Sequence, residues 1–174
     1  RHHLKMARAT YGIFIDWNND NDFSDANEDI TADVADFNWS YGRDRANQLR
    51  GKSISADFNA VLRNLTGKYN SYNSSSVLYG KIKPGRKVRL TMTVGATTVT
   101  MFQGFLDLIE PRPEASGAHT ALLRAFGPLS FINQKIVDIV SQTSVTAKTI
   151  IDAILDAAGW SAADRSIDTG QTTF

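Results

Sequence analysis

The chain has 174 residues, of which 42% are hydrophobic and 21% are charged, a balance typical of a globular protein with a sizeable core. It contains no cysteine, which excludes disulfides, cysteine-based zinc sites and a cysteine nucleophile. No apolar run approaches the roughly 18 residues that span a bilayer, so we expect no membrane insertion.

Charge is distributed unevenly along the sequence. Residues 1–9 resemble the end of a histidine tag that runs into a start at Met6, and they hold three bases and no acid, so the formal net charge of +1 becomes −2 for residues 10–174. This balance removes the main support for nucleic-acid binding. Residues 10–42 carry eight acids and no Lys or Arg, whereas residues 43–89 carry eleven bases and two acids. Either these segments neutralise each other within the fold, or an acidic face of one subunit meets a basic face of the next.

Alternation of apolar and polar residues predicts a mainly β (α+β) fold, with a β-rich domain followed by C-terminal helices. In the second predicted strand, Ala35, Phe37, Trp39 and Tyr41 share the apolar face. The predicted strands are residues 11–15, 35–41, 54–62, 88–94, 97–109 and 120–126.

The fourth and fifth predicted strands form a hairpin. Gly95 and Ala96 make its turn, and Gly104 marks a bulge or bend in the returning strand. Pro111 and Pro113 are expected to end that strand, because proline cannot donate to a β-ladder.

An acidic loop, residues 16–29, follows the first predicted strand. Its side-chain oxygens recur at every second position, as in a loop that points successive ligands at a calcium ion. Asn21 at the sixth position and Asn27 at the twelfth depart from the EF-hand pattern, and the flanking segments are strand-like. The alternative is therefore a polar turn whose side chains bond their own backbone. The candidate calcium ligands are Asp16, Asn18, Asp20, Asp22, Ser24 and Glu28.

A long loop, the stretch from Asn64 to Arg89, leads from the strand predicted at residues 54–62 into the strand predicted at residues 88–94. Loops longer than roughly 12 to 15 residues are usually functional or disordered, and its three tyrosines argue against disorder because large aromatic side chains need packing partners. We interpret this stretch as a basic, aromatic assembly loop. The alternative is that its tyrosines form a stacking platform for a glycan. The predicted assembly residues are Arg43, Tyr69, Tyr72, Tyr79, Lys81, Lys83 and Arg86.

Helical spacing replaces the β pattern after residue 128. A first helix is predicted at residues 129–140, and a second begins after Thr146 as N-cap and ends before Gly159. The last residues are polar and stop without a closing element, so we expect the sequence to be the N-terminal part of a longer protein. The expected domains are a leader at 1–9, a β domain at 10–128, and a helical segment at 129–174 that begins a second domain.

Catalytic motifs are absent from the sequence. No P-loop, Rossmann glycine pattern, nucleophile elbow or zinc motif is present. Outside the leader, His119 is the one histidine, and we expect it to be an exposed residue at the start of a strand. We therefore predict that the chain is not an enzyme.

Several short motifs follow one another in a definite order: Asp16-Trp17, Phe23-Ser24-Asp25, Trp39 to Arg43, Asn64 to Tyr69, Leu78-Tyr79-Gly80, Pro84 to Arg89, and Phe102-Gln103-Gly104-Phe105. Their order resembles tail proteins of bacteriophages and prophages, and in particular the hub proteins of tail tips and baseplates. The resemblance covers residues 11–160. It implies that residues 10–128 form a small antiparallel β-barrel or split barrel, and that identical subunits assemble as a ring, commonly a trimer. It also implies contacts with the tail tube and tail tip, no catalysis in this part, and a location in the virion, at a tail tip or baseplate assembled in the bacterial host cytoplasm.

Overall fold

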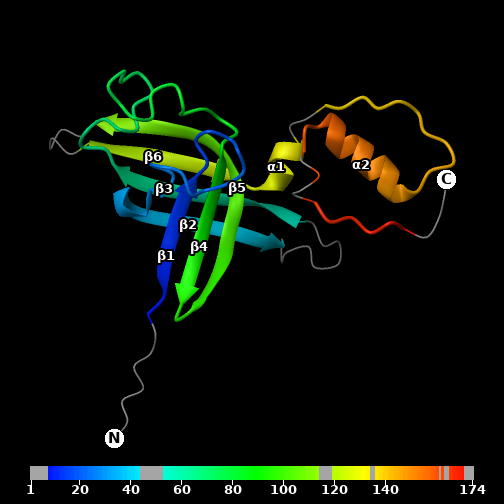
Figure 1. The fold of residues 1–174 in the computed structure, drawn as a ribbon, viewed down its shortest axis with the longest axis horizontal. Helices are drawn as coiled ribbons and strands as arrows, with labels where there is room; N and C mark the ends of the chain where they lie inside the picture. Colours follow the sequence, from blue (N-terminus) through cyan, green and yellow to red (C-terminus); the bar gives the residue numbers. More distant parts are fainter. Residues whose placement is uncertain are drawn as a thin grey trace, which may run out of the picture. The chain divides into compact units, whose positions relative to one another are not determined.

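The computed structural model describes residues 8–43, 53–113, 119–133, 136–160, 162 and 165–170. The chain divides into two compact units, Arg1–Leu129 and Ser130–Phe174. Within the described residues, no helix is both long and apolar enough to cross a membrane. The elements are β1 Thr10–Ile15, η1 Thr31–Asp33, β2 Val34–Arg43, β3 Ser53–Arg63, β4 Lys87–Val94, β5 Thr97–Pro113, β6 His119–Phe126, α1 Pro128–Asn133 and α2 Ala147–Ala157 (Figure 1).

The first unit is built on one antiparallel sheet with the strand order β1-β4-β5-β6-β3-β2. Figure 1 shows β1 and β4 running across the direction of β2 and β3, so the sheet is curled into a half-barrel. The predicted mainly β fold is confirmed. The barrel is split, because β1 and β2 are the two edges of the sheet and are not hydrogen-bonded neighbours.

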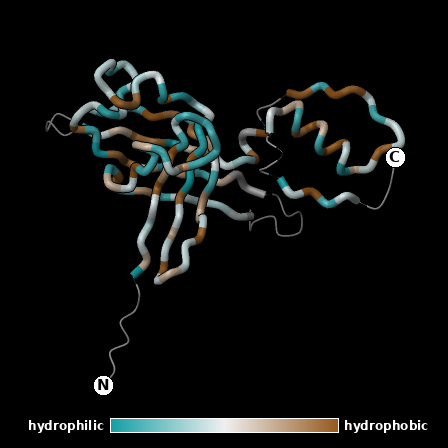
Figure 2. The backbone as a smooth tube through the Cα atoms, viewed as in Figure 1, coloured by the Kyte–Doolittle hydropathy of each residue, from teal (hydrophilic) through white to brown (hydrophobic). Residues whose placement is uncertain are grey.

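The core lies inside the curl of this sheet. Phe58 of β3 stacks on Phe102 of β5 with ring centroids 5.4 Å apart, and Tyr11 of β1 contacts Phe37 of β2 edge-on at 5.2 Å. These contacts join strands from both halves of the curl. Figure 2 shows hydrophobic positions recurring between hydrophilic ones along the strands, as one buried face requires.

The predicted apolar face of β2 is wrong at both of its ends. Phe37 and Trp39 do pack against the core, but Ala35 is exposed and the Tyr41 side chain is 69% exposed. A register shift between Val34 and Asp36 explains the first error, because the extra residue turns Val34 toward the core in place of Ala35. A second shift follows Ser40.

The two prolines of β5 do not end the strand, which corrects the sequence prediction. Pro111 pairs with Ala121 and Pro113 pairs with His119 of β6. The pairing of β4 with β5 ends at Phe105, so these prolines lie where β5 is an edge strand and a missing N–H is tolerated.

Gly104 was predicted to mark a bulge or a bend, and it does not lie at a bulge, because it pairs regularly with Val88. The register shifts fall on either side of it, near Met101 and Asp107. A Cβ at position 104 would lie 2.3 Å from the carbonyl oxygen of Phe126, so glycine is required here by a close approach of backbone.

The first predicted helix is much shorter than expected, because α1 ends at Asn133. Ile136 is 103% exposed and Val140 is 85% exposed, in a segment without helical structure. Ile136, Val137, Ile139 and Val140 are all β-branched, which lowers helix propensity, and their spacing suggested a helix that does not form over residues 136–140.

The second predicted helix, α2, has the expected caps. The Thr146 side chain accepts a hydrogen bond from the backbone N–H of Thr149. Gly159 has a φ of 77° and donates to Asp156, while Trp160 donates to Leu155. This pair of bonds is a Schellman motif, so the helix ends where local sequence predicts.

Candidate functional site

The acidic loop is organised around the buried carboxylate of Asp16. One oxygen, Oδ1, accepts from the backbone N–H groups of Asn19 and Asp20, and Oδ2 accepts from that of Asn21 at 3.0 Å. Asn19 and Asn21 both have positive φ, which asparagine tolerates better than most residues. Asp16 therefore folds the first half of the loop around its own side chain.

Glu28 closes the second half of the loop and is 1% exposed. Its Oε1 accepts from the backbone N–H of Trp17, and Oε2 accepts from that of Asp25, both at 3.1 Å. Burial raises the pKa of Glu28 above its ordinary value although these amides favour the charged form. The indole of Trp17, also buried, donates to the carbonyl of Asn27 at 2.8 Å. The loop is thus held against the core near both of its ends, by the buried side chains of Asp16 and Glu28.

The candidate calcium ligands have different environments. Asp16 and Glu28 are buried and bonded to backbone amides, whereas Asn18, Asp20, Asp22 and Ser24 are exposed and bonded within the loop. Among the described residues, no three acidic or histidine side chains converge to hold a metal ion. The bonds seen are those of the polar-turn alternative, and calcium binding stays a prediction with a direct test given below.

Arg89 of β4 connects the acidic loop to the sheet. Its guanidinium lies 4.1 Å from the ring centroid of Phe23 in the loop and 5.1 Å from that of Phe14 in β1. A cation on an aromatic face is attracted by the ring quadrupole. The acidic segment, residues 10–42, and the basic segment, residues 43–89, therefore meet through a cation–aromatic contact as well as through opposite charge.

The long loop, residues 64–86, is folded by a series of turns at intervals of three residues. Backbone N–H groups of residues 67, 70, 73, 76 and 79 each donate to the carbonyl three positions earlier. Side chains reinforce the series, since Asn70 accepts from the N–H of Tyr72 and Asn73 accepts from that of Ser75. A spacing of three connects Asn64, Gly67, Asn70, Asn73 and Ser76, and this signal in the sequence could have predicted the turns.

Tyr69 anchors the long loop in the core. Its side chain is fully buried, and its hydroxyl donates to Oδ2 of Asp33 at 2.5 Å. Lys68 forms a salt bridge with the same oxygen at 2.8 Å. Burial alone would raise the pKa of Asp33, but the bonds from Lys68 and Tyr69 outweigh it and hold this pKa below its ordinary value. Burial and then Asp33 raise the pKa of Tyr69.

Tyr69 is therefore removed from the predicted assembly residues, because a fully buried side chain cannot contact a partner. Tyr72 and Tyr79 are 92% and 56% exposed, and Lys81 and Lys83 are exposed beside them in sequence. Arg86 is partly buried and its Nε donates to the carbonyl of Lys81. The remaining predicted residue, Arg43, is the last residue of β2 and lies outside this loop.

The acidic and long loops adjoin at the end of the sheet where β1 finishes and β4 begins (Figure 1). The backbone N–H of Asp16 donates to the carbonyl of Lys87 at 3.0 Å. Asn27 of the acidic loop and Val77 of the long loop line one cavity of about 270 Å³. Lys68 and Asp33 form one ion pair between the acidic and basic segments, as the neutralisation alternative predicts.

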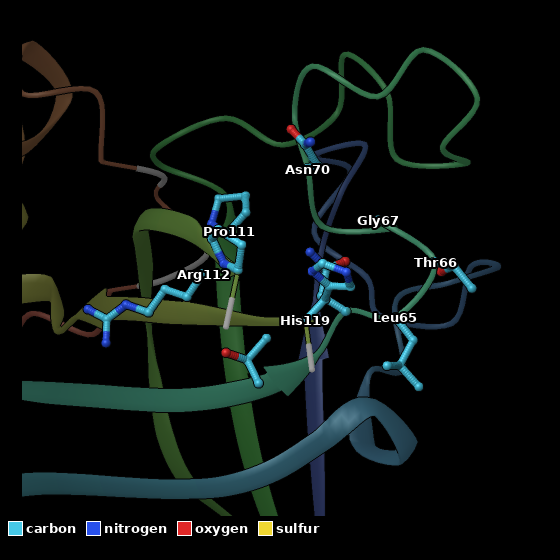
Figure 3. Close-up of a pocket in the computed structure, with 10 residues that line it drawn as sticks. Leu65, Thr66, Gly67, Asn70, Pro111, Arg112 and His119 are labelled. Carbon is cyan, nitrogen blue, oxygen red and sulfur yellow. The ribbon is translucent and has the colours of Figure 1, made fainter. Parts of the chain in front are cut away.

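A second cavity, of about 390 Å³, lies between the start of the long loop and the paired ends of β5 and β6 (Figure 3). His119 begins β6 and is exposed, which confirms its predicted place. Figure 3 shows the Arg112 side chain pointing away from His119. Arg112 pairs instead with Glu110 at 3.2 Å. Pro111 and Pro113 also line this cavity.

No protein-family model matches the chain, and no curated protein matches it.

Proposed function

We propose that this chain is a structural component of a phage or phage-like tail, a tail-tip or baseplate hub that joins the tail tube to the distal apparatus through ring assembly. The observation that carries the proposal is the asymmetry of the two sheet edges. The outer edge of β1 is covered by residues 28–31, since Ile13 exchanges bonds with Ile30 and Thr31 and Ile15 donates to Glu28.

The outer edge of β2 has no such cover. Among the described residues, the backbone of β2 bonds to β3, and outside β3 only Val34, at the very start of the strand, donates its N–H to the carbonyl of Thr31. An open strand edge is a template for pairing with another chain, and proteins that remain monomers usually block it. A ring of subunits would remove this edge from solvent, in agreement with the ring that the resemblance to tail hubs implies.

The long loop supports a protein neighbour and not a small ligand. It presents two exposed tyrosines and two exposed lysines on a backbone that is already ordered by turns, so little conformational entropy is lost on docking. Tyrosine is enriched among the residues that dominate protein interfaces. In this proposal the chain has a structural and not a catalytic role, and its partners are copies of itself and other tail proteins.

Location in the tail is tested by electron microscopy of phage-like particles from the bacterium that carries the gene. Gold-labelled antibody against this chain should bind at one end of the tail, and particles without label there would contradict the proposal. Ring closure is tested by mass photometry with the tail-tube protein added. The substitutions Asn38→Lys and Ser40→Lys on β2 should prevent assembly, whereas Thr97→Lys and Thr100→Lys on the exposed part of β5 serve as the matched control.

A second candidate is a calcium-dependent glycan- or receptor-binding module. The observation that favours it is the 92% exposure of Tyr72, an aromatic ring held out from a folded loop beside the acidic loop. Binding on a glycan array should then disappear with chelator and with Tyr72→Ala. Binding that survives both treatments, or no binding to any glycan, would reject this candidate.

A further inference from the structure

The loop end of the first unit presents two adjoining surfaces of opposite charge. The acidic surface has four exposed carboxylates, and the basic surface has two exposed lysines in the long loop. Within the described part of the chain, none of these six side chains forms a salt bridge. The one ion pair found there between residues 10–42 and residues 43–89 is that of Lys68 and Asp33. The side chains are Asp20, Asp22, Asp25, Asp29, Lys81 and Lys83.

The same end also exposes apolar area. Leu65 is 72%, Tyr72 is 92%, Val77 is 59% and Tyr79 is 56% exposed, and all four belong to the long loop. Large exposed apolar groups gathered in one segment and bordered by charges are typical of an interaction site. The surface is held ready for a partner, because the turns and the buried Tyr69 order the loop in the single subunit.

We infer that the partner at this surface is a second copy of the chain, docked face to face about a two-fold axis. In such a contact the long loop of each copy lies on the acidic loop of the other. The two-fold axis therefore creates two equivalent contacts, each between a basic and an acidic surface. A copy docked without this reversal would set acid against acid. The unpaired charges within one subunit are thereby neutralised by the other.

This inference rests on the assembly role proposed for the long loop and adds the identity of its neighbour. The contact uses the loop end of the unit and leaves the outer edge of β2 unoccupied. Ring closure through that edge and the face-to-face contact are therefore separate and can fail separately.

The test uses two charge-reversed variants of the chain. The acid-reversed variant is Asp25→Lys with Asp29→Lys, two positions outside the candidate calcium ligands. The base-reversed variant is Lys81→Glu with Lys83→Glu. Arg8→Glu with Arg124→Glu is the control, because both side chains are exposed and the same number of reversals is placed outside both loops. Each is measured alone and in pairs by sedimentation velocity, at low and at high ionic strength in the presence of chelator, and each is melted to verify folding.

We expect the unaltered chain and the control to dimerise at low ionic strength and to dissociate as salt screens the contact. Each reversed variant alone should lose the dimer, because it sets like charges against each other at both loops. An equal mixture of the two reversed variants should recover it, since every contact in the mixed dimer is again between opposite charges. Recovery also proves that neither variant was merely unfolded.

Three results would overturn the inference. The first is a strict monomer in the unaltered chain at low ionic strength, and the second is a mixture of folded reversed variants that stays monomeric. The third is a trimer as the smallest assembly, because a two-fold contact cannot close with three subunits. If the chain fails this dimerisation test but the antibody still labels one end of the tail, the face-to-face contact is refuted and the proposed function stands.

Discussion

Removing the hydroxyl of Tyr69 tests whether this residue anchors the long loop. In Tyr69→Phe the ring stays in its buried place, and the backbone bond from the Tyr69 N–H to Oδ1 of Asn64 is retained. The change removes one hydrogen bond, the 2.5 Å contact with Asp33. It is therefore a smaller and cleaner perturbation than truncation to alanine, which would also open a cavity.

The expected loss follows from the chemistry of this bond. A hydrogen bond to a charged group contributes about 1.5 to 3 kcal/mol to stability. Asp33 keeps 31% of its side chain exposed and retains the salt bridge to Lys68, so water replaces part of the lost bond. We expect the lower end, about 1.5 kcal/mol, which for a domain of this size lowers Tm by about 3 to 6 °C.

The pH dependence separates this mechanism from a packing effect. Because the folded-state pKa of Asp33 is lowered, its contribution to stability is present above its unfolded pKa and disappears as pH falls through the folded value. The difference in melting temperature between the unaltered chain and Tyr69→Phe should thus be largest at neutral pH and shrink below about pH 4.

Thermal and urea unfolding at several pH values provide the measurement. Tyr72→Phe is the matched control, because Tyr72 is 92% exposed and should lose no stability. Equal stability of Tyr69→Phe and the unaltered chain at neutral pH would refute the anchoring role. So would a deficit that stays constant while Asp33 is protonated.

Three further predictions concern other parts of the chain. Gly104→Ala should destabilise the first unit by about 1 to 3 kcal/mol in urea unfolding, because the new Cβ meets the Phe126 carbonyl, and a neutral result would contradict the close approach. If the acidic loop binds calcium, excess calcium should raise Tm relative to chelator, by about 2.7 kcal/mol of stability at a hundredfold excess over Kd, and Asp20→Asn should weaken the effect. An unchanged Tm at millimolar calcium would show that the acidic loop is not a calcium site. Thr146→Ala should destabilise α2 by about 1 kcal/mol and so speed amide hydrogen exchange in its first turn. Unchanged exchange would contradict the capping role of Thr146.

Much of the candidate site was visible in the sequence, although its internal arrangement was not. The acidic loop and the basic loop were both recognised from charge and composition. Nothing local distinguishes Tyr69 from Tyr72, since both follow a polar residue in a stretch of Asn and Ser. Tyr69 is fully buried and hydrogen-bonded to Asp33, which is 36 residues away in sequence, whereas Tyr72 is almost fully exposed.

The sequence by itself determined the features that depend on neighbouring residues. Period-two alternation defines the strands, Gly95 defines the hairpin turn, and Thr146 with Gly159 defines α2, because hydrogen bonding and backbone sterics act over a few residues. Tertiary structure alone decided which positions lie beside another segment. It carried β5 through two prolines where β4 has ended, moved Val34 into the core at a register shift, and left β2 as an open edge. Burial depends on what the rest of the chain brings to a position, and periodicity carries no information about that.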